Sequence, residues 1–281
     1  PRSPPRCRRG GCRDAGGGGG GAPPPPGGPP PPPPPPPPRG APPPRPLDRA
    51  LGRVLALDPR PDCMVITGDL VDHGSPEEYR ILHELIRRFP LPLHLVAGNH
   101  DEPDALLNEF AGTRFVGEGE QAHYGVDFAA FTLVVLNSQV PHSGGGHLGA
   151  AQLDWLDGAL ARRPSTPAVV CLHHPPIAIG IPFLDGMRLD DGEELGRVLA
   201  RHGNAARVLA GHVHRPIIAP LAGSTLAIAP STHLQSGLAL RHGVPNYLPE
   251  PTSFLLHLLV GPSWITHTVP VSHASAPIGG F

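Results

Sequence analysis

The 281-residue chain contains no lysine, and all 22 of its basic residues are arginine. It also has no run approaching the roughly 18 apolar residues that span a bilayer, so no membrane partner is predicted. The Arg-rich N-terminus has no apolar core, which argues against a secretory signal. The four cysteines form no C-x-x-C pair. This spacing argues against a disulfide framework and predicts reduced thiols in a cytoplasmic protein.

Negative charge is nearly absent from the first part of the chain. Residues 1–46 hold seven arginines and one acid, Asp14, so they carry a net charge of +6. The remaining residues must then carry −8 to give the total of −2. An acidic body repels a polyanion, so nucleic acid is not expected as a partner.

Proline and glycine, in contrast, dominate the first 46 residues, where they take 32 positions. Residues 16–21 are all glycine and predict a flexible segment, whereas residues 29–38 are all proline and predict a polyproline II rod. Such a composition cannot bury a core. We therefore predict a low-complexity disordered tail over 1–46, or a mistranslated or artefactual extension, followed by one domain over 47–281.

The domain shows alternating helix and strand patterns. Residues 75–78, Ser-Pro-Glu-Glu, form a capping box that predicts a helix to about Arg88. Further helices are expected over 47–55, 150–161 and 193–202, and strands over 63–67, 93–97, 131–136, 168–172, 208–210, 226–229, 253–259 and 265–269. This order predicts an α/β fold with a mixed sheet, whose polar motifs follow the carboxyl ends of strands.

Four of these strand ends carry residue types that bind metals. Carboxylate, carboxamide and imidazole donors suit Mn, Fe, Co or Zn, and each accompanying glycine permits close backbone approach. Singly, such residues are more often turn or cap residues; together they predict a metal site. The motifs are Gly68-Asp69, Gly98-Asn99-His100-Asp101, His173-His174-Pro175-Pro176 and Gly211-His212-Val213-His214.

These motifs resemble the signature of calcineurin-like metallophosphoesterases. Their surroundings, such as Gly68-Asp69-Leu70-Val71-Asp72 and Leu172-His173-His174-Pro175-Pro176, are similar to bacterial class III cyclic-nucleotide phosphodiesterases and the related glycerophosphodiesterases. The resemblance covers about residues 47–270. It implies a two-layer mixed β-sandwich flanked by helices, with a centre of two divalent metal ions.

The resemblance also implies a role for each motif residue. Asp69 would bridge both metals, and His214 would bind the first. The second metal would be completed by Asn99, His173 and His212. His100 would be catalytic, stabilising the transition state or protonating the leaving oxygen, with Asp101 orienting its ring.

The implied activity is hydrolysis of a small phosphodiester by metal-bound hydroxide. We expect 3′,5′-cyclic AMP to be preferred. A glycerophosphodiester stays the alternative, because loops such as 140–147 and 179–188 would set specificity. A homo-oligomer is compatible with these features.

The chain departs from the family in one respect. The family begins with Asp-x-His at the end of its first strand, and no aspartate upstream of Asp69 has a histidine two residues later. The second metal keeps four ligands, whereas the first keeps Asp69 and His214. We therefore expect a domain without its first strand that binds one metal and is poorly active. The other reading is an inactive remnant whose proline-rich tail binds an SH3- or WW-like partner.

Four further residues are expected to have no metal-binding or catalytic role. His174 is expected behind the ligands or as a substrate contact. Asp72 is expected to be a loop residue, and His94 to face the sheet. Cys171 is expected to be a buried thiol.

Overall fold

The computed structural model describes residues 46–117, 121–241 and 243–271. Apart from Pro46, the predicted low-complexity tail lies outside these residues. The helices are α1 Pro46–Leu55, α2 Pro76–Ile86, α3 Pro103–Phe110, α4 Gly149–Ala161, α5 Pro182–Asp185 and α6 Gly192–His202. The strands are β1 Met64–Ile66, β2 Leu93–Leu95, β3 Tyr124–Asp127, β4 Thr132–Val135, β5 Ala168–Cys171, β6 Ala205–Ala210, β7 Ile217–Leu221, β8 Ser224–Ile228, β9 Gln235–Ser236, β10 Tyr247–Leu248, β11 Ser253–Val260 and β12 Ser263–Pro270.

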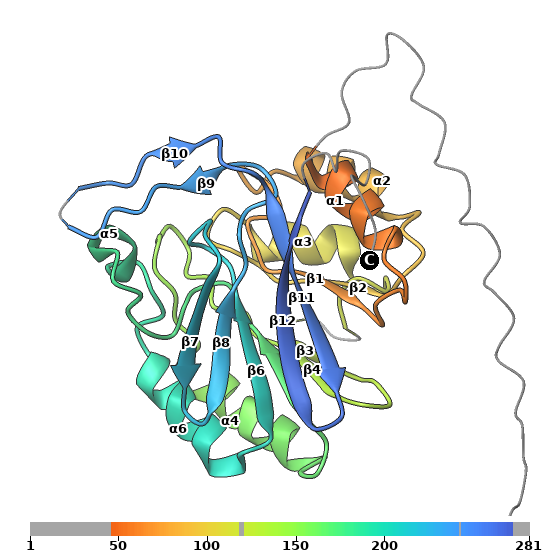
Figure 1. Ribbon diagram of the computed structural model, residues 1–281, viewed down its shortest axis with the longest axis vertical. Coiled ribbons are helices and arrows are strands. Elements are labelled where there is room, and N and C mark those ends of the chain that lie inside the picture. The colour runs from red at the N-terminus through yellow and green to blue at the C-terminus, as the bar shows by residue number, and fades with distance from the viewer. Residues whose placement is uncertain (1–45, 118–120, 242, 272–281) are drawn as a thin grey trace, which may run out of the picture. The chain divides into compact units, whose positions relative to one another are not determined.

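A six-stranded mixed sheet in the order β3-β4-β5-β6-β8-β7 forms the centre of the described domain (Figure 1). Strands β4, β5, β6 and β8 are parallel, while β3 and β7 join antiparallel at the two edges. The remaining strands pair as parallel β1-β2 and as antiparallel β9-β10 and β11-β12. The predicted α/β fold with a mixed sheet is therefore confirmed.

Alternation along the central strands separates two hydrophobic cores. Val134 of β4 and Val170 of β5 face a core that includes α4 and α6. Their neighbours Leu133 and Val169 face the opposite core, which holds α1, α2, α3 and strand β2. Because strand side chains alternate between faces, one sheet is covered on both sides and its carboxyl ends stay open for a site. Figure 1 shows the two helix groups on opposite sides of the sheet.

The capping box predicted at the start of α2 is present. The Ser75 hydroxyl accepts a hydrogen bond from the Glu78 amide, and the Glu78 carboxylate accepts one from the Ser75 amide at 3.0 Å. Every other predicted helix and strand also appears, within a few residues of its expected bounds. Six elements were not predicted: α3, α5, β3, β7, β9 and β10.

Candidate metal centre

Three of the predicted ligands have an unusual backbone conformation. Asp69, His212 and His214 have φ angles of 51°, 66° and 55°. In the described part of the chain only five non-glycine residues have positive φ, and these three are among them. A left-handed conformation costs roughly 1–3 kcal/mol for a non-glycine residue and is concentrated at functional sites. The chain is thus strained where it turns these side chains toward one another.

Glycines allow the strand ends to approach closely. Gly68 has φ 99°, and a Cβ there would overlap the His173 ring. A Cβ on Gly211 would overlap the Thr67 carbonyl oxygen. The ends of β1, β5 and β6 therefore lie close enough for their loops to share one site.

Four predicted ligands place one donor atom each in a single cluster. Asn99 Oδ1 lies 3.1 Å from His173 Nε2 and 2.9 Å from His212 Nδ1. His173 Nε2 lies 3.3 Å from His212 Nδ1 and 3.4 Å from Asp69 Oδ1. Donors about 2.1 Å from one cation stand about 3.0–3.4 Å apart across octahedral or tetrahedral angles. These four separations fit ligands of one first-row cation.

The protonation of these groups also fits a cation. His173 Nδ1 donates to the Thr67 carbonyl at 2.7 Å, so in the neutral ring Nε2 is an acceptor. It faces two more acceptors, Asn99 Oδ1 and Asp69 Oδ1, and a cation between them removes the repulsion. His212 Nδ1 is the ring nitrogen that faces Asn99 Oδ1 and His173 Nε2, while Nε2 is buried without a hydrogen-bond partner in the described structure.

The electrostatics keep the donors in their metal-binding forms. Burial, followed by the neighbouring His173, lowers the pKa of His212 to about 3. Burial also lowers the pKa of His173. For Asp69, burial opposes ionisation, but the nearby imidazoles of His173 and His214 hold its pKa well below the usual range. Metal ligation requires neutral imidazoles and an ionised carboxylate, and the directions of these pKa shifts at His173, His212 and Asp69 favour those forms.

The other oxygen of the Asp69 carboxylate, Oδ2, has fewer predicted ligands around it. Asp69 Oδ2 lies 3.9 Å from His214 Nε2, and His214 Nδ1 is buried without a partner in the described residues. Of the predicted ligands, two face this position. Four donors hold a first-row cation well, whereas two leave most of its coordination to water or substrate.

His100 lies beside this cluster with its side chain 47% exposed. Its amide donates to Asp69 Oδ1 at 3.2 Å, and its Nδ1 lies 3.0 Å from the Asp72 carbonyl oxygen. The expected contact between Asp101 and the His100 ring is not among the hydrogen bonds of the described residues. The Asp72 carbonyl contacts the ring instead. The sequence analysis expected Asp72 to be an ordinary loop residue, since only folding brings the loop after β1 next to His100.

Asp101 instead joins the two ligand-bearing loops. Its Oδ2 accepts hydrogen bonds from the amides of Leu70 at 3.1 Å and Gly98 at 2.7 Å. Its Oδ1 accepts one from the Tyr79 hydroxyl at 3.0 Å. These amides adjoin Asp69 and Asn99, so a buried carboxyl fixes the spacing of two ligands. Burial is the main cause that raises the pKa of Asp101 to about 7.

We expect Asp101→Ala to lower kcat/KM about 10–100-fold, as the loss of groups behind metal ligands does. It also leaves two buried amides unpaired, at about 1–3 kcal/mol each. Asp101→Asn keeps an oxygen for those amides and should stay within about threefold of wild type. Steady-state kinetics of both variants checks this. An equal loss in both would show that the negative charge is required and would contradict a positioning role.

His174 lies directly behind the cluster. It is fully buried, and its Nδ1 is 2.9 Å from the Ser138 hydroxyl. His173, His174 and His212 each offer a ligand atom within 4.8 Å of the others. The four-donor cluster stays the expected cation position, because its separations of 2.9–3.4 Å suit one cation and because it includes the carboxylate. Ser138 gave no signal in the sequence, because 36 residues separate it from its partner.

The sequence profile of calcineurin-like phosphoesterases matches residues 45–216. The chain belongs to the calcineurin-like phosphoesterase family. The resemblance predicted from the motifs is thus confirmed, and the chain is a member of a family of hydrolases. The match includes the strand ends that carry all the predicted ligands.

Individual relatives agree with this family assignment. The chain is 28% identical over 220 residues to the glycerophosphodiester phosphodiesterase GpdQ of Enterobacter lignolyticus, covering 78% of this chain and 79% of that one. It is 31% identical over 215 residues to the 3′,5′-cyclic adenosine monophosphate phosphodiesterase CpdA of Escherichia coli, covering 73% and 69%. It is 35% identical over 175 residues to a probable cyclic nucleotide phosphodiesterase of Synechococcus, covering 62% and 66%.

A solved structure confirms the fold. A dimetal phosphatase from Danio rerio superposes with a TM-score of 0.61 at 15% identity, covering 80% of this chain and 86% of that one. Among the described residues, no helix is both long and apolar enough to cross a bilayer. The family fold and the donor set together support divalent metal ions as cofactors.

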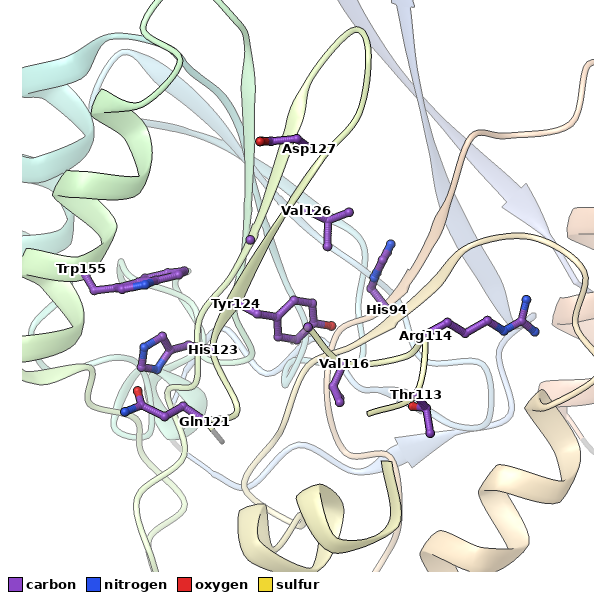
Figure 2. A pocket seen from close by; sticks show the side chains of 12 residues that line it. His94, Thr113, Arg114, Val116, Gln121, His123, Tyr124, Val126, Asp127 and Trp155 are labelled. Atoms are coloured by element: carbon purple, nitrogen blue, oxygen red, sulfur yellow. The ribbon is translucent and has the colours of Figure 1, made fainter. Parts of the chain in front are cut away.

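A cavity of about 940 Å³ lies away from this centre, along the edge strand β3. Figure 2 shows His94, Tyr124 and Trp155 around it, and none of its lining residues is a predicted ligand. His94 is 5% exposed, with the rings of Phe128 and Tyr124 at 6.0 Å and 6.2 Å. Both its ring nitrogens lack a partner in the described structure.

His94 is expected to make the fold sensitive to acid. Burial lowers its pKa from 6.5 to about 4, so between these values the unfolded chain binds the extra proton. Stability therefore falls as pH falls through this window. We expect His94→Phe to remove this pH-dependent penalty, so that its stabilising effect is about 2 kcal/mol larger at pH 5 than at pH 7.5. Urea unfolding at both pH values measures the difference. An equal effect at both would contradict this account.

Proposed function

We propose that the chain hydrolyses a small phosphodiester, with 3′,5′-cyclic AMP as the preferred substrate. The observation that carries the proposal is the cluster of Asp69, Asn99, His173 and His212 donors with the exposed His100 at its side. The similarity to CpdA, whose name specifies cyclic AMP, supports the preferred substrate.

Each residue of the cluster has a defined part in this chemistry. Asp69, Asn99, His173 and His212 would hold one cation, and Asp69 with His214 would face a second. When bound, divalent cations neutralise the charge of the diester and supply a nucleophilic water at neutral pH. Neutral, buried imidazoles and an ionised carboxylate keep the donors available, so the protein need not release their protons first.

His100 is suited to the proton transfer that completes the reaction. Burial disfavours its charge, but the hydrogen bond to the Asp72 carbonyl and the carboxylates of Asp69 and Asp72 raise its pKa. Its Nδ1 is occupied by that carbonyl, which leaves Nε2 to face the substrate. A protonated imidazole at this position can stabilise the transition state or donate a proton to the leaving oxygen.

A glycerophosphodiester is the second candidate substrate. The alignment with GpdQ extends over 79% of that relative, more than the 69% of CpdA that is aligned. The metal cluster and His100 would serve either diester, because both present the same phosphorus centre. The difference lies in the groups that recognise the rest of the substrate.

Turnover is expected to be below that of relatives with a complete centre. Four ligands surround one cation position, whereas Asp69 Oδ2 and His214 Nε2 alone represent the other among the predicted ligands. Without a second firmly held cation, less charge is neutralised in the transition state. A cytoplasmic location and a homo-oligomeric state stay predictions of the sequence.

The test is hydrolysis of cyclic AMP and of glycerophosphoethanolamine by the purified chain with Mn²⁺, with Asn99→Ala as the inactive control. The proposal expects turnover of cyclic AMP with the higher kcat/KM and a loss in the control. A higher kcat/KM for the glycerophosphodiester would favour the second candidate. No turnover of either substrate at any Mn²⁺ concentration would overturn the proposal and favour an inactive remnant.

A further inference from the structure

Tyr247 presents an exposed aromatic ring beside the metal cluster. Its side chain, on β10, is 64% exposed. Its ring centroid lies 5.6 Å from that of His214, with 34° between the planes. A tyrosine this exposed keeps most of its apolar ring in water, and the free face of the ring is open to a planar partner.

The position of this ring is tied to the ligand loop. Tyr247 pairs with Ser236 in the antiparallel β9-β10 ladder. The Ser236 amide donates to the His214 carbonyl at 3.1 Å, and the Gly237 amide donates to the Asn246 carbonyl at 2.7 Å. Figure 1 shows β9 and β10 at the end of the described domain to which the parallel strands β6 and β8 lead. The ring is therefore held at the metal end of the sheet by backbone hydrogen bonds.

We propose that Tyr247 is a specificity-determining residue that stacks on the base of a cyclic nucleotide. This inference rests on the proposed function. In a 3′,5′-cyclic nucleotide, one ribose ring separates the base from the phosphorus. Tyr247 contacts His214, so its ring lies at a comparable position beside the predicted metal site. Aromatic rings stack on any nucleobase, because every base has a π face. A glycerol headgroup has none, so the same ring discriminates between the two candidate substrates.

The chemistry of the neighbouring residues agrees with this assignment. The described segment around β10 also exposes the apolar Leu240 and Val244, at 61% and 66%, together with the polar Arg241 and Asn246. The exposed aromatic ring favours a flat heterocycle over a hydroxylated headgroup, because only the heterocycle has a π face. The ring also adjoins the predicted metal position, because its neighbour His214 has Nε2 3.9 Å from Asp69 Oδ2.

The experiment compares Tyr247→Ala, Tyr247→Phe and the control Val260→Ala, a 54% exposed residue at the end of β11, on cyclic AMP and glycerophosphoethanolamine with Mn²⁺. For Tyr247→Ala we expect KM for cyclic AMP to rise about tenfold or more, with kcat and the kinetics of the glycerophosphodiester unchanged. Tyr247→Phe keeps the ring and should restore KM, and Val260→Ala should match wild type.

Calorimetric titration of cyclic AMP into each Mn²⁺-loaded variant gives a readout that does not need turnover. Weaker cyclic AMP binding in Tyr247→Ala, but not in the other variants, supports the inference even if the wild type turns over neither substrate. Absence of turnover would by itself overturn only the proposed function. An unchanged affinity for cyclic AMP, equal losses on both substrates, or failure of Tyr247→Phe to restore KM would each overturn it.

Discussion

Replacing Asp69 with alanine is expected to abolish tight cation binding and to lower kcat/KM by about a thousandfold or more. The reason is geometric: Asp69 Oδ1 is part of the four-donor cluster and Oδ2 faces His214, so one substitution removes an oxygen from both positions. Equilibrium dialysis with Mn²⁺ and steady-state kinetics measure the two effects.

A matched control separates this effect from the loss of any carboxylate. Glu193 has an 89% exposed side chain in the first turn of α6, and Glu193→Ala should retain wild-type metal content and activity. Thermal unfolding without metal shows whether Asp69→Ala is folded. A folded Asp69→Ala variant that binds Mn²⁺ as tightly as the wild type would contradict the assignment of the cluster.

Replacing His100 with alanine is expected to lower kcat by about 10²–10⁴-fold while metal content stays unchanged. His100 contacts Asp69 through its backbone amide, which alanine keeps, and its ring is not part of the four-donor cluster. His73→Ala is the matched control, because its side chain is 79% exposed in the adjoining loop.

The pH profile gives a second test of His100. Its raised pKa means that the ring stays protonated to a higher pH than a free imidazole and loses the proton as pH rises further. If the protonated ring is the active form, kcat should fall on the alkaline side of that pKa. The His100→Ala variant should lack this limb. An identical alkaline limb in both proteins would show that another group titrates.

Much of the fold follows from local sequence patterns. The helix α2 was predicted because Ser75 and Glu78 cap it, and the central strands because their residues are apolar and bounded by turns. The edge strand β3 was not predicted, since Gly125 and Asp127 weaken its pattern. The edge strand β7 contains Pro220, which argues against a strand except at a sheet edge.

The site was predictable in its composition but not in all its contacts. Strand-end motifs predicted Asp69, Asn99, His173 and His212 as ligands, and the fold brings them together because each follows a strand whose carboxyl end meets the others. Two residues that hold predicted site residues, Asp72 for His100 and Ser138 for His174, lie 28 and 36 positions from their partners. Such pairings depend on the geometry of the folded loops, which cannot be read from a local sequence pattern. The placement of Tyr247 was not predicted either, because β9 and β10 have two residues each and are too short to give a strand pattern.

The most direct test of the metal centre is the number of cations that the purified chain holds. The chain is dialysed against micromolar Mn²⁺, and bound metal is measured by inductively coupled plasma mass spectrometry, with the electron paramagnetic resonance spectrum recorded on the same sample. Four donors at one position and two at the other predict one tightly bound Mn²⁺ per chain, with an uncoupled spectrum, lost in His212→Ala. Two tightly bound ions per chain with a spin-coupled signal would contradict the account.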